Sequence, residues 1–228
     1  MTLNIPLFLE IYREIPYLGY KDSQRIGEFC EIFSLEEPFT RTVSSFVSDK
    51  TKVADLCCGK PSKIREIARS NLRCQFVGFD VNPRMAKFYR GENLSFVRAD
   101  VNLLLDIKTE GMLAVHACGS LSDRVVELSV ALNLPVLVVP CCYGKLNGSP
   151  PTPLSETFSS GELLGIYHTL NRIAKRSEGS NWCKGMGTLI RTLFNYDRLA
   201  RLEESGKKAR LLRLTDMHRP HNLAIIGE

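Results

Sequence analysis

The sequence has no long apolar run and no leader-like start, and each absence excludes one kind of segment. No apolar stretch reaches about 18 residues, so we predict no membrane-spanning helix. The opening residues, MTLNIPLFLEIYREIPYLGYKD, have no basic n-region and include Glu10 and Arg13, which is not the pattern of a secretory signal peptide. We therefore expect an intracellular, cytoplasmic protein with no membrane partner.

A phosphate-binding loop is also missing. The segment VADLCCGKPSK, residues 53–63, has one glycine and a proline after its first lysine. A Walker loop needs two glycines and ends in Gly-Lys-Ser or Gly-Lys-Thr. The segment also lacks the glycine spacing that seats a pyrophosphate at the start of a helix. Both nucleoside triphosphates and dinucleotides are therefore disfavoured as ligands.

Spaced cysteines are lacking, although the sequence has eight cysteines. No C-x-x-C occurs, and Cys57–Cys58 and Cys141–Cys142 are adjacent pairs at the ends of apolar runs rather than disulfide staples. With His116 and Cys118, the second pair makes up the donor inventory of a zinc site. Adjacent strand residues point to opposite faces, however, so we predict reduced thiols that pack a pocket and no metal. A non-catalytic thiol- or metal-binding module is the alternative.

What the sequence does contain is the pattern of one α/β domain. Its 228 residues, 44% hydrophobic and 24% charged, suit a single well-packed core. From Lys52 onward, short apolar runs alternate with helical patterns, which predicts a doubly wound, mostly parallel sheet covered by helices on both faces. We assign residues 1–51 to an N-terminal helical extension or lid and residues 52–228 to the domain. After the fifth strand we expect a Pro/Ser/Gly-rich loop at 148–161, then helices at about 162–176 and 185–204, and two closing strands.

Three predicted strands end in acidic residues. Ligands of open α/β sheets bind at the carboxyl ends of the strands, so these residues mark the candidate site. Asp55 precedes the first turn, where Gly59 can adopt a positive φ. Asp80 ends the second strand, where an acid can accept hydrogen bonds from ribose hydroxyls. Asp100 ends the third and could accept from an adenine amino group. Together they favour a nucleoside ligand without phosphate, although acids after strands also occur as plain turn residues.

The motifs VADLCCGK, VGFDVNP and VRADV resemble the S-adenosylmethionine site of the seven-stranded, Rossmann-like class I methyltransferases. HACGSLSD, residues 116–123, and VPCCYGKL, residues 139–146, resemble the methyltransferase domain of the glutathione S-transferase C-terminal domain-containing proteins. They are less closely similar to the tRNA 2′-O-methyltransferases that modify the acceptor stem. The resemblance covers roughly residues 52–228 and implies S-adenosyl-L-methionine as the cofactor.

The resemblance also implies which residues bind the cofactor. Asp55 and Gly59 would flank its methionine moiety, Asp80 its ribose and Asp100 its adenine. The family usually has glycine where this sequence has Cys57, and a cysteine can take that place if its φ is negative. The whole expected set is Asp55, Cys57, Gly59, Asp80, Val81, Asp100, Val101 and His116.

Methyl transfer asks mainly for alignment, because the sulfonium donor is already activated. His116 is the candidate base for an acceptor that holds a proton, and a structural hydrogen bond is the alternative role. Asp123 could orient His116 or Lys145, or favour the start of a helix by its charge. Tyr143 could stack on a base or on the cofactor.

Clustered cations towards the C-terminal half favour RNA, with tRNA first, as the methyl acceptor. The formal net charge of +5 is modest, so a small molecule or a protein is the alternative acceptor. The residues expected to contact RNA are Arg172, Lys175, Arg176, Lys207, Lys208 and Arg210.

Overall fold

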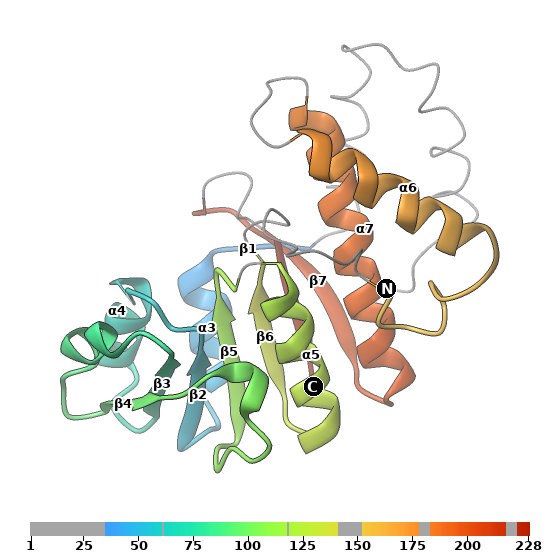
Figure 1. Ribbon diagram of the computed structural model, residues 1–228. Helices are drawn as coiled ribbons and strands as arrows, with labels where there is room; N and C mark the ends of the chain where they lie inside the picture. Colours follow the sequence, from blue (N-terminus) through green and yellow to red (C-terminus); the bar gives the residue numbers. More distant parts are fainter. Residues whose placement is uncertain (1–34, 61, 118, 141–151, 178–182, 218–222) are drawn as a thin grey trace.

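The computed structural model describes residues 35–60, 62–117, 119–140, 152–177, 183–217 and 223–228 (Figure 1). Its sheet has eight strands in the order β1-β7-β8-β6-β5-β2-β3-β4. All neighbours are parallel except that β8 is antiparallel to both β6 and β7. The strands are β1 Leu35–Glu37, β2 Lys52–Leu56, β3 Gln75–Asp80, β4 Leu94–Arg98, β5 Gly111–Val115, β6 Val136–Val139, β7 Ala209–Leu214 and β8 Leu223–Gly227.

Helices cover both faces of this sheet. One core cluster joins α3 and α4 to one face, and a second joins α5, α6 and α7 to the other. The predicted doubly wound α/β class is therefore confirmed. The helices are α3 Phe39–Val47, α4 Ser62–Ser70, α5 Ser120–Leu132, α6 Gly161–Ser177 and α7 Cys183–Glu204, with short 3₁₀ helices η2 Pro83–Phe88 and η3 Val101–Leu103.

Strand β2 shows why the apolar runs of the sequence are nearly continuous. Its side chains alternate, so that Val53 packs with α3 and α4, whereas Ala54 and Leu56 pack with the cluster of α5, α6 and α7. Because both faces are covered, both sets are apolar. Asp55 is the exception: it is a buried acid in the middle of the sheet.

The expected number of seven strands is wrong by one within the described part of the chain. The eighth strand, β1, comes from the segment that we predicted to be helical, and it pairs in parallel with β7 through Leu35 and Leu212. Helix α3 follows, with Phe39 and Phe46 buried in the core. The backbone N–H of Phe39 donates to Asp216 Oδ1 at 2.6 Å, which ties the start of α3 to the end of β7.

Two helix assignments also differ in detail. Ser122 and Asp123 in the sequence suggest a capped helix that begins at Asp123, but α5 begins at Ser120 after Gly119, whose φ is +57°. Ser122 instead donates its hydroxyl to the carbonyl of Ala117 at 2.6 Å. Pro83 suits the first turn of an α-helix, but the segment that it begins is the 3₁₀ helix η2, with Asn82 accepting from the backbone N–H of Arg84. Among the described residues, no helix is both long and apolar enough to cross a membrane.

The strand order fixes where a ligand can bind. From β2 the chain moves outward to β3 and β4, then returns to place β5 on the other side of β2. The order therefore reverses between β2 and β5. In open α/β sheets the crevice outside the carboxyl ends at such a reversal is the usual ligand site.

Candidate functional site

The turn after β2 is held in an unusual backbone conformation. Cys57 has φ +56° and Gly59 has φ +48°. The condition under which a cysteine could easily replace glycine here, a negative φ, is therefore not met, and Cys57 occupies a left-handed conformation that favours glycine. The backbone N–H of Cys58 donates to the carbonyl of Phe79 at 3.1 Å, so the turn closes against the end of β3.

Asp80 organises the same turn. Its Oδ2 accepts from the backbone N–H of Gly59 at 3.1 Å, and its Oδ1 accepts from the backbone N–H of Asn82 at 2.8 Å. A carboxylate oxygen can accept more than one hydrogen bond, so Asp80 keeps acceptor capacity for a ligand. Val81, the next residue, is 57% exposed at this edge.

Asp55 is the most unusual acid in the molecule. Its side chain is 1% exposed, its Oδ2 accepts from the hydroxyl of Tyr89, and its Oδ1 has no hydrogen-bond partner among the described residues. Burial raises the pKa of Asp55 to about 7, against the hydrogen bond from Tyr89, which lowers that pKa, and with the charge of Asp80, which raises it. An unpaired buried acceptor of this kind is a candidate ligand contact.

Tyr89 is a site residue that the sequence analysis missed. It lies after η2, is 3% exposed and places its ring against Gly78 of β3. A Cβ at Gly78 would lie 2.6 Å from that ring, so only glycine leaves room for it. The signal was present as a glycine in the middle of the strand run QFVGFD, since such a glycine often marks a close approach.

The thiol of Cys58, three residues after Asp55, is not activated. Cys58 is buried, and burial together with the charge of Asp55 raises the pKa of its thiol well above the usual range. Within the described ranges, no three His, Cys, Asp or Glu side chains are grouped to hold a metal. Three of the four residues considered for zinc, Cys118, Cys141 and Cys142, lie outside those ranges.

Asp100 and Val101 begin the loop after β4. Asp100 caps η3, and its Oδ1 accepts from the backbone N–H and the side-chain amide of Asn102, both at 2.9 Å. Val101 packs into the core with 5% of its surface exposed. Arg124 of α5 donates to the carbonyls of Val101 and Leu104 at 3.2 and 2.7 Å, which fixes this loop.

His116 lies directly after β5, on the other side of the reversal in strand order. It is exposed, has φ +65°, and its backbone N–H donates to the carbonyl of Val139 at 2.9 Å. Asp123, in the first turn of α5, forms a 2.7 Å ion pair with the buried Arg198 of α7. That contact joins two helices, a role not expected from the sequence. Tyr143 and Lys145 lie outside the described residues.

Of the six cations expected to bind RNA, the structure describes the side chains of three, Lys207, Lys208 and Arg210. Ala209 pairs with Gly227, which pairs with Val136, so Lys207 and Lys208 lie at the amino ends of the strands, opposite the candidate site. Lys207 is buried and donates to Asn133 Oδ1 at 3.3 Å, and Arg210 lies 3.9 Å from Glu228. The remaining three, Arg172, Lys175 and Arg176, belong to α6, but their side chains are outside the described part.

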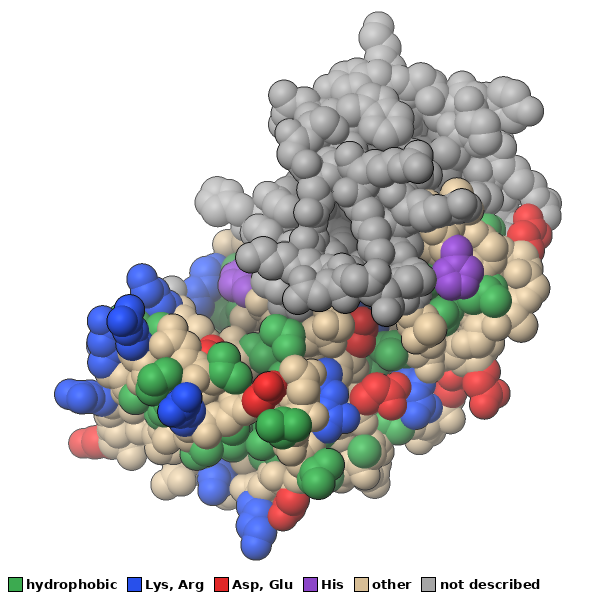
Figure 2. Space-filling view, viewed as in Figure 1, with side chains coloured by type: hydrophobic (Ala, Val, Ile, Leu, Met, Phe, Trp, Pro, Cys, Tyr) green, Lys and Arg blue, Asp and Glu red, His purple; other side chains and the backbone are tan. Residues whose placement is uncertain are grey.

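Figure 2 shows Lys and Arg side chains gathered instead at the left end of the molecule, the side on which Figure 1 places α4, β3 and β4.

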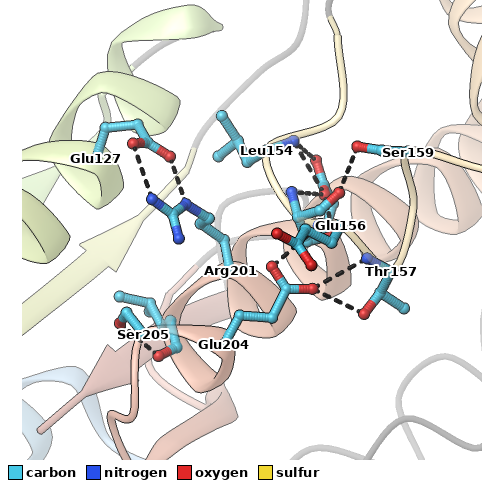
Figure 3. A network of polar contacts seen from close by, with 11 residues as sticks. Glu127, Leu154, Glu156, Thr157, Ser159, Arg201, Glu204 and Ser205 are labelled. Atoms are coloured by element: carbon cyan, nitrogen blue, oxygen red, sulfur yellow. Dashed lines mark hydrogen bonds and ion pairs between the residues drawn. The ribbon is translucent and has the colours of Figure 1, made fainter.

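The structure describes residues 152–160 of the loop expected at 148–161, and this part is hydrogen-bonded to α7 (Figure 3). The buried Asp197 accepts from the backbone N–H groups of Leu154 and Ser155 and from the Ser155 hydroxyl. Glu204 accepts from the backbone and hydroxyl of Thr157. These hydrogen bonds hold residues 154–157 against α7.

Comparison with known protein families is consistent with the fold and the candidate site described above. The model of a methyltransferase domain family matches residues 25–149. The glutathione S-transferase C-terminal domain-containing protein homolog of Drosophila melanogaster is 30% identical over 125 residues, which are 50% of this chain and 21% of that protein. Its human counterpart is 25% identical over 140 residues, 59% of this chain and 22% of that protein. The chain thus spans about a fifth of the length of these relatives.

Among solved structures, human N-acetylserotonin methyltransferase in complex with S-adenosylmethionine aligns with 94% of this chain and 58% of its own. The alignment has 14% identity and a TM-score of 0.47. The family match covers more than half of this chain, including the turn after β2 and the ends of β3, β4 and β5. The chain belongs to the methyltransferase domain family.

Proposed function

We propose that this domain transfers the methyl group of S-adenosyl-L-methionine to an acceptor. The observation that carries the proposal is the row of acids Asp55, Asp80 and Asp100 at three neighbouring strand ends beside the reversal in strand order. The match of residues 25–149 to a methyltransferase domain family supports the same chemistry.

The residues present fit this cofactor. Asp55 offers a buried oxygen without a partner for the cationic methionine end, and Asp80 keeps acceptor capacity for ribose hydroxyls. Asp100 would face the adenine, and Val81 supplies exposed apolar surface nearby. No phosphate-binding loop is needed, because this cofactor carries no phosphate. When bound, the sulfonium supplies an already activated methyl group.

The task of the chain is then to align the acceptor and to remove its proton. His116 is the proposed base, because it is exposed at the end of β5, next to β2 in the sheet. Its positive φ costs free energy, and such strain at a non-glycine residue is commonly retained at functional sites.

For the acceptor we propose RNA, with tRNA as the first candidate. The excess of positive charge supports a polyanionic acceptor. A small molecule or a protein is the alternative, and the contacts through the C-terminal cations stay a prediction. For the location we propose the cytoplasm, because the adjacent cysteine pairs do not fit a disulfide framework.

Calorimetric titration of S-adenosylmethionine and S-adenosylhomocysteine tests the cofactor. We expect micromolar binding that Asp80→Ala abolishes and that Asp106→Ala, a change at an exposed acid in another loop, leaves intact. No binding by the unmodified protein would refute the proposal. Labelled cofactor with tRNA, small-molecule and protein acceptors then identifies the substrate, and His116→Ala should retain cofactor binding while losing transfer.

A further inference from the structure

The positive charge of this chain is concentrated in one stretch of sequence. Between Cys57 and Asp100 there are nine Lys and Arg residues against four Asp and Glu, an excess equal to the formal net charge of +5 of the whole chain. This stretch runs from the turn after β2 to the loop after β4, so it includes three of the strand ends that make up the candidate site.

Three of these cations lie together beside the turn. Lys60 directly follows Gly59, and its ammonium lies 5.9 Å from the centre of the Phe88 ring. The ammonium of Lys87 lies 5.0 Å from the centre of the same ring. Arg84 precedes Lys87 by three residues in η2, and a 3₁₀ helix brings residues i and i+3 to the same side. We call Lys60, Arg84 and Lys87 the cationic rim.

The rim is exposed and has no counter-charge. All three side chains are exposed, and within the described part of the chain none of them forms an ion pair. By contrast, Lys63 is paired with Asp216, and Arg213 is paired with Glu36. The rim therefore presents unneutralised charge to solvent.

We propose that the cationic rim binds the phosphate backbone of the RNA acceptor, which rests on the proposed function and names the surface that it uses. The rim borders the candidate cofactor turn, whereas Lys207 and Lys208 lie at the opposite end of the sheet. Phosphates are neutralised by such unpaired Lys and Arg side chains, and releasing their counterions drives the binding. The half-buried Phe88 ring, which both lysines approach, and the exposed Val81 add apolar surface for bases.

The test compares two triple charge reversals. One reverses the rim, Lys60→Glu, Arg84→Glu and Lys87→Glu. The control, Arg69→Glu, Arg73→Glu and Lys208→Glu, makes the same change of net charge at exposed cations that lie at the other end of the sheet. Binding of a fluorescein-labelled tRNA transcript is measured by anisotropy from low to physiological salt, and circular dichroism and S-adenosylmethionine titration verify that both variants fold.

We expect the rim variant to bind tRNA at least about 10-fold more weakly and to lower the salt slope by about 2–3, since each lost phosphate contact lowers it by about 1. The control should stay within about 3-fold with its slope unchanged. Equal losses in both variants, or no tRNA binding by the unmodified protein, would overturn the proposal. Displacement of the labelled tRNA by polyglutamate as effectively as by unlabelled tRNA would indicate an acidic protein as the partner and would also overturn it. Tighter binding of a DNA copy of the same sequence than of the tRNA would do the same.

The same measurements separate this inference from the proposed function. If tRNA binds through the rim but S-adenosylmethionine does not bind, the RNA surface stands and the methyltransferase proposal fails. If the cofactor binds and tRNA does not, the proposed activity stands with another acceptor and the rim assignment fails.

Discussion

At the scale of single residues, the end of β2 holds two groups in states that cost free energy. Cys57 has a left-handed backbone, and Asp55 is an acid buried in a largely apolar sheet. Neither state helps the domain to fold, since glycine and an apolar residue would serve better there. Costs of this kind are commonly kept where function requires them.

Replacing Cys57 measures the backbone cost. We expect Cys57→Gly to be more stable than Cys57→Ala by about 0.5–1 kcal/mol, because the left-handed conformation penalises any Cβ whereas glycine loses more chain entropy on folding. Both variants lack the thiol, so the comparison isolates the backbone. Urea denaturation gives the two free energies of unfolding, and equal values would contradict the assigned conformation.

The pH dependence of stability measures the cost at Asp55. Its pKa is raised from 3.8 to about 7 by folding, so the folded state holds a proton that the unfolded state releases. The stability contributed by the protonated acid is complete below about pH 4 and is lost as pH rises through 7, by at most about 1.4 kcal/mol per pH unit. Asp55→Asn should remove this decline and be as stable as the unmodified protein, or more so, at pH 8, while binding the cofactor worse.

Denaturation at pH 5 and pH 8 provides the measurement. Asp106→Asn, at an exposed acid, is the matched control and should keep the decline. An unchanged decline in Asp55→Asn would mean that another group causes it.

The sequence predicted the acids at the strand ends because residue type and strand pattern are local properties. It could not predict the conformation of Cys57, which follows from closing the turn against Phe79 across the sheet. Nor could it find Tyr89, since its contact with Asp55 joins residues 34 positions apart. The burial of Lys207 against Asn133 could not be predicted either, since these two residues are also far apart in the sequence.

At the scale of elements, α7 acts as an anchor for the segment that leads into α6. Asp197 and Glu204 lie on this helix at a spacing of seven residues and so face the same side, and both accept hydrogen bonds from residues 154–157. Between them, Arg201 pairs with Glu127 of α5 at 2.9 Å. A segment whose composition is typical of a mobile loop is thereby fixed.

Removing the buried anchor should release this segment. Asp197→Ala leaves two backbone N–H groups and the Ser155 hydroxyl without their acceptor, so we expect a loss of about 3 kcal/mol in stability. Glu204→Ala, at an exposed position, should cost less than about 1 kcal/mol. Hydrogen exchange of residues 154–158 is the local measurement, and equal protection in both variants would contradict the role of Asp197.

The elements from Lys52 onward were predictable from apolar runs of strand length and helical spacing. Strand β1 was not, because three residues, Leu-Glu-Glu, carry no periodic signal, and their partners in β7 lie far away in the sequence, with Leu35 opposite Leu212. The 3₁₀ form of η2 was equally hidden, since its sequence also suits an α-helix.

At the scale of the whole molecule, the segment before Lys52 contributes to both the core and the sheet. Helix α3 buries Phe39, Val43, Phe46 and Val47 against the face that α4 also covers, and β1 covers the edge of β7. Burying a side chain of this size contributes about 1.5–3 kcal/mol. The domain therefore depends on residues that lie outside the boundary at residue 52.

A chain that starts at Lys52 should consequently fold poorly. We expect it to lose most of its thermal stability and to aggregate, because a core face and the edge of β7 become exposed. The full chain is the control and should show a cooperative thermal transition. Size-exclusion chromatography and calorimetry compare the two, and a monomeric, cooperatively melting chain from Lys52 would contradict this view.

Strand β8, residues 223–227, has a consequence for how the protein is made. It is buried along its whole length between β6 and β7, and it is the only described neighbour that joins them. While a ribosome produces the chain, β6 emerges well before β8, whereas β7, residues 209–214, emerges only shortly before it. The nascent domain therefore carries an open edge on β6, beyond its pairing with β5, until residue 227 has left the exit tunnel, and the sheet can close only after that point.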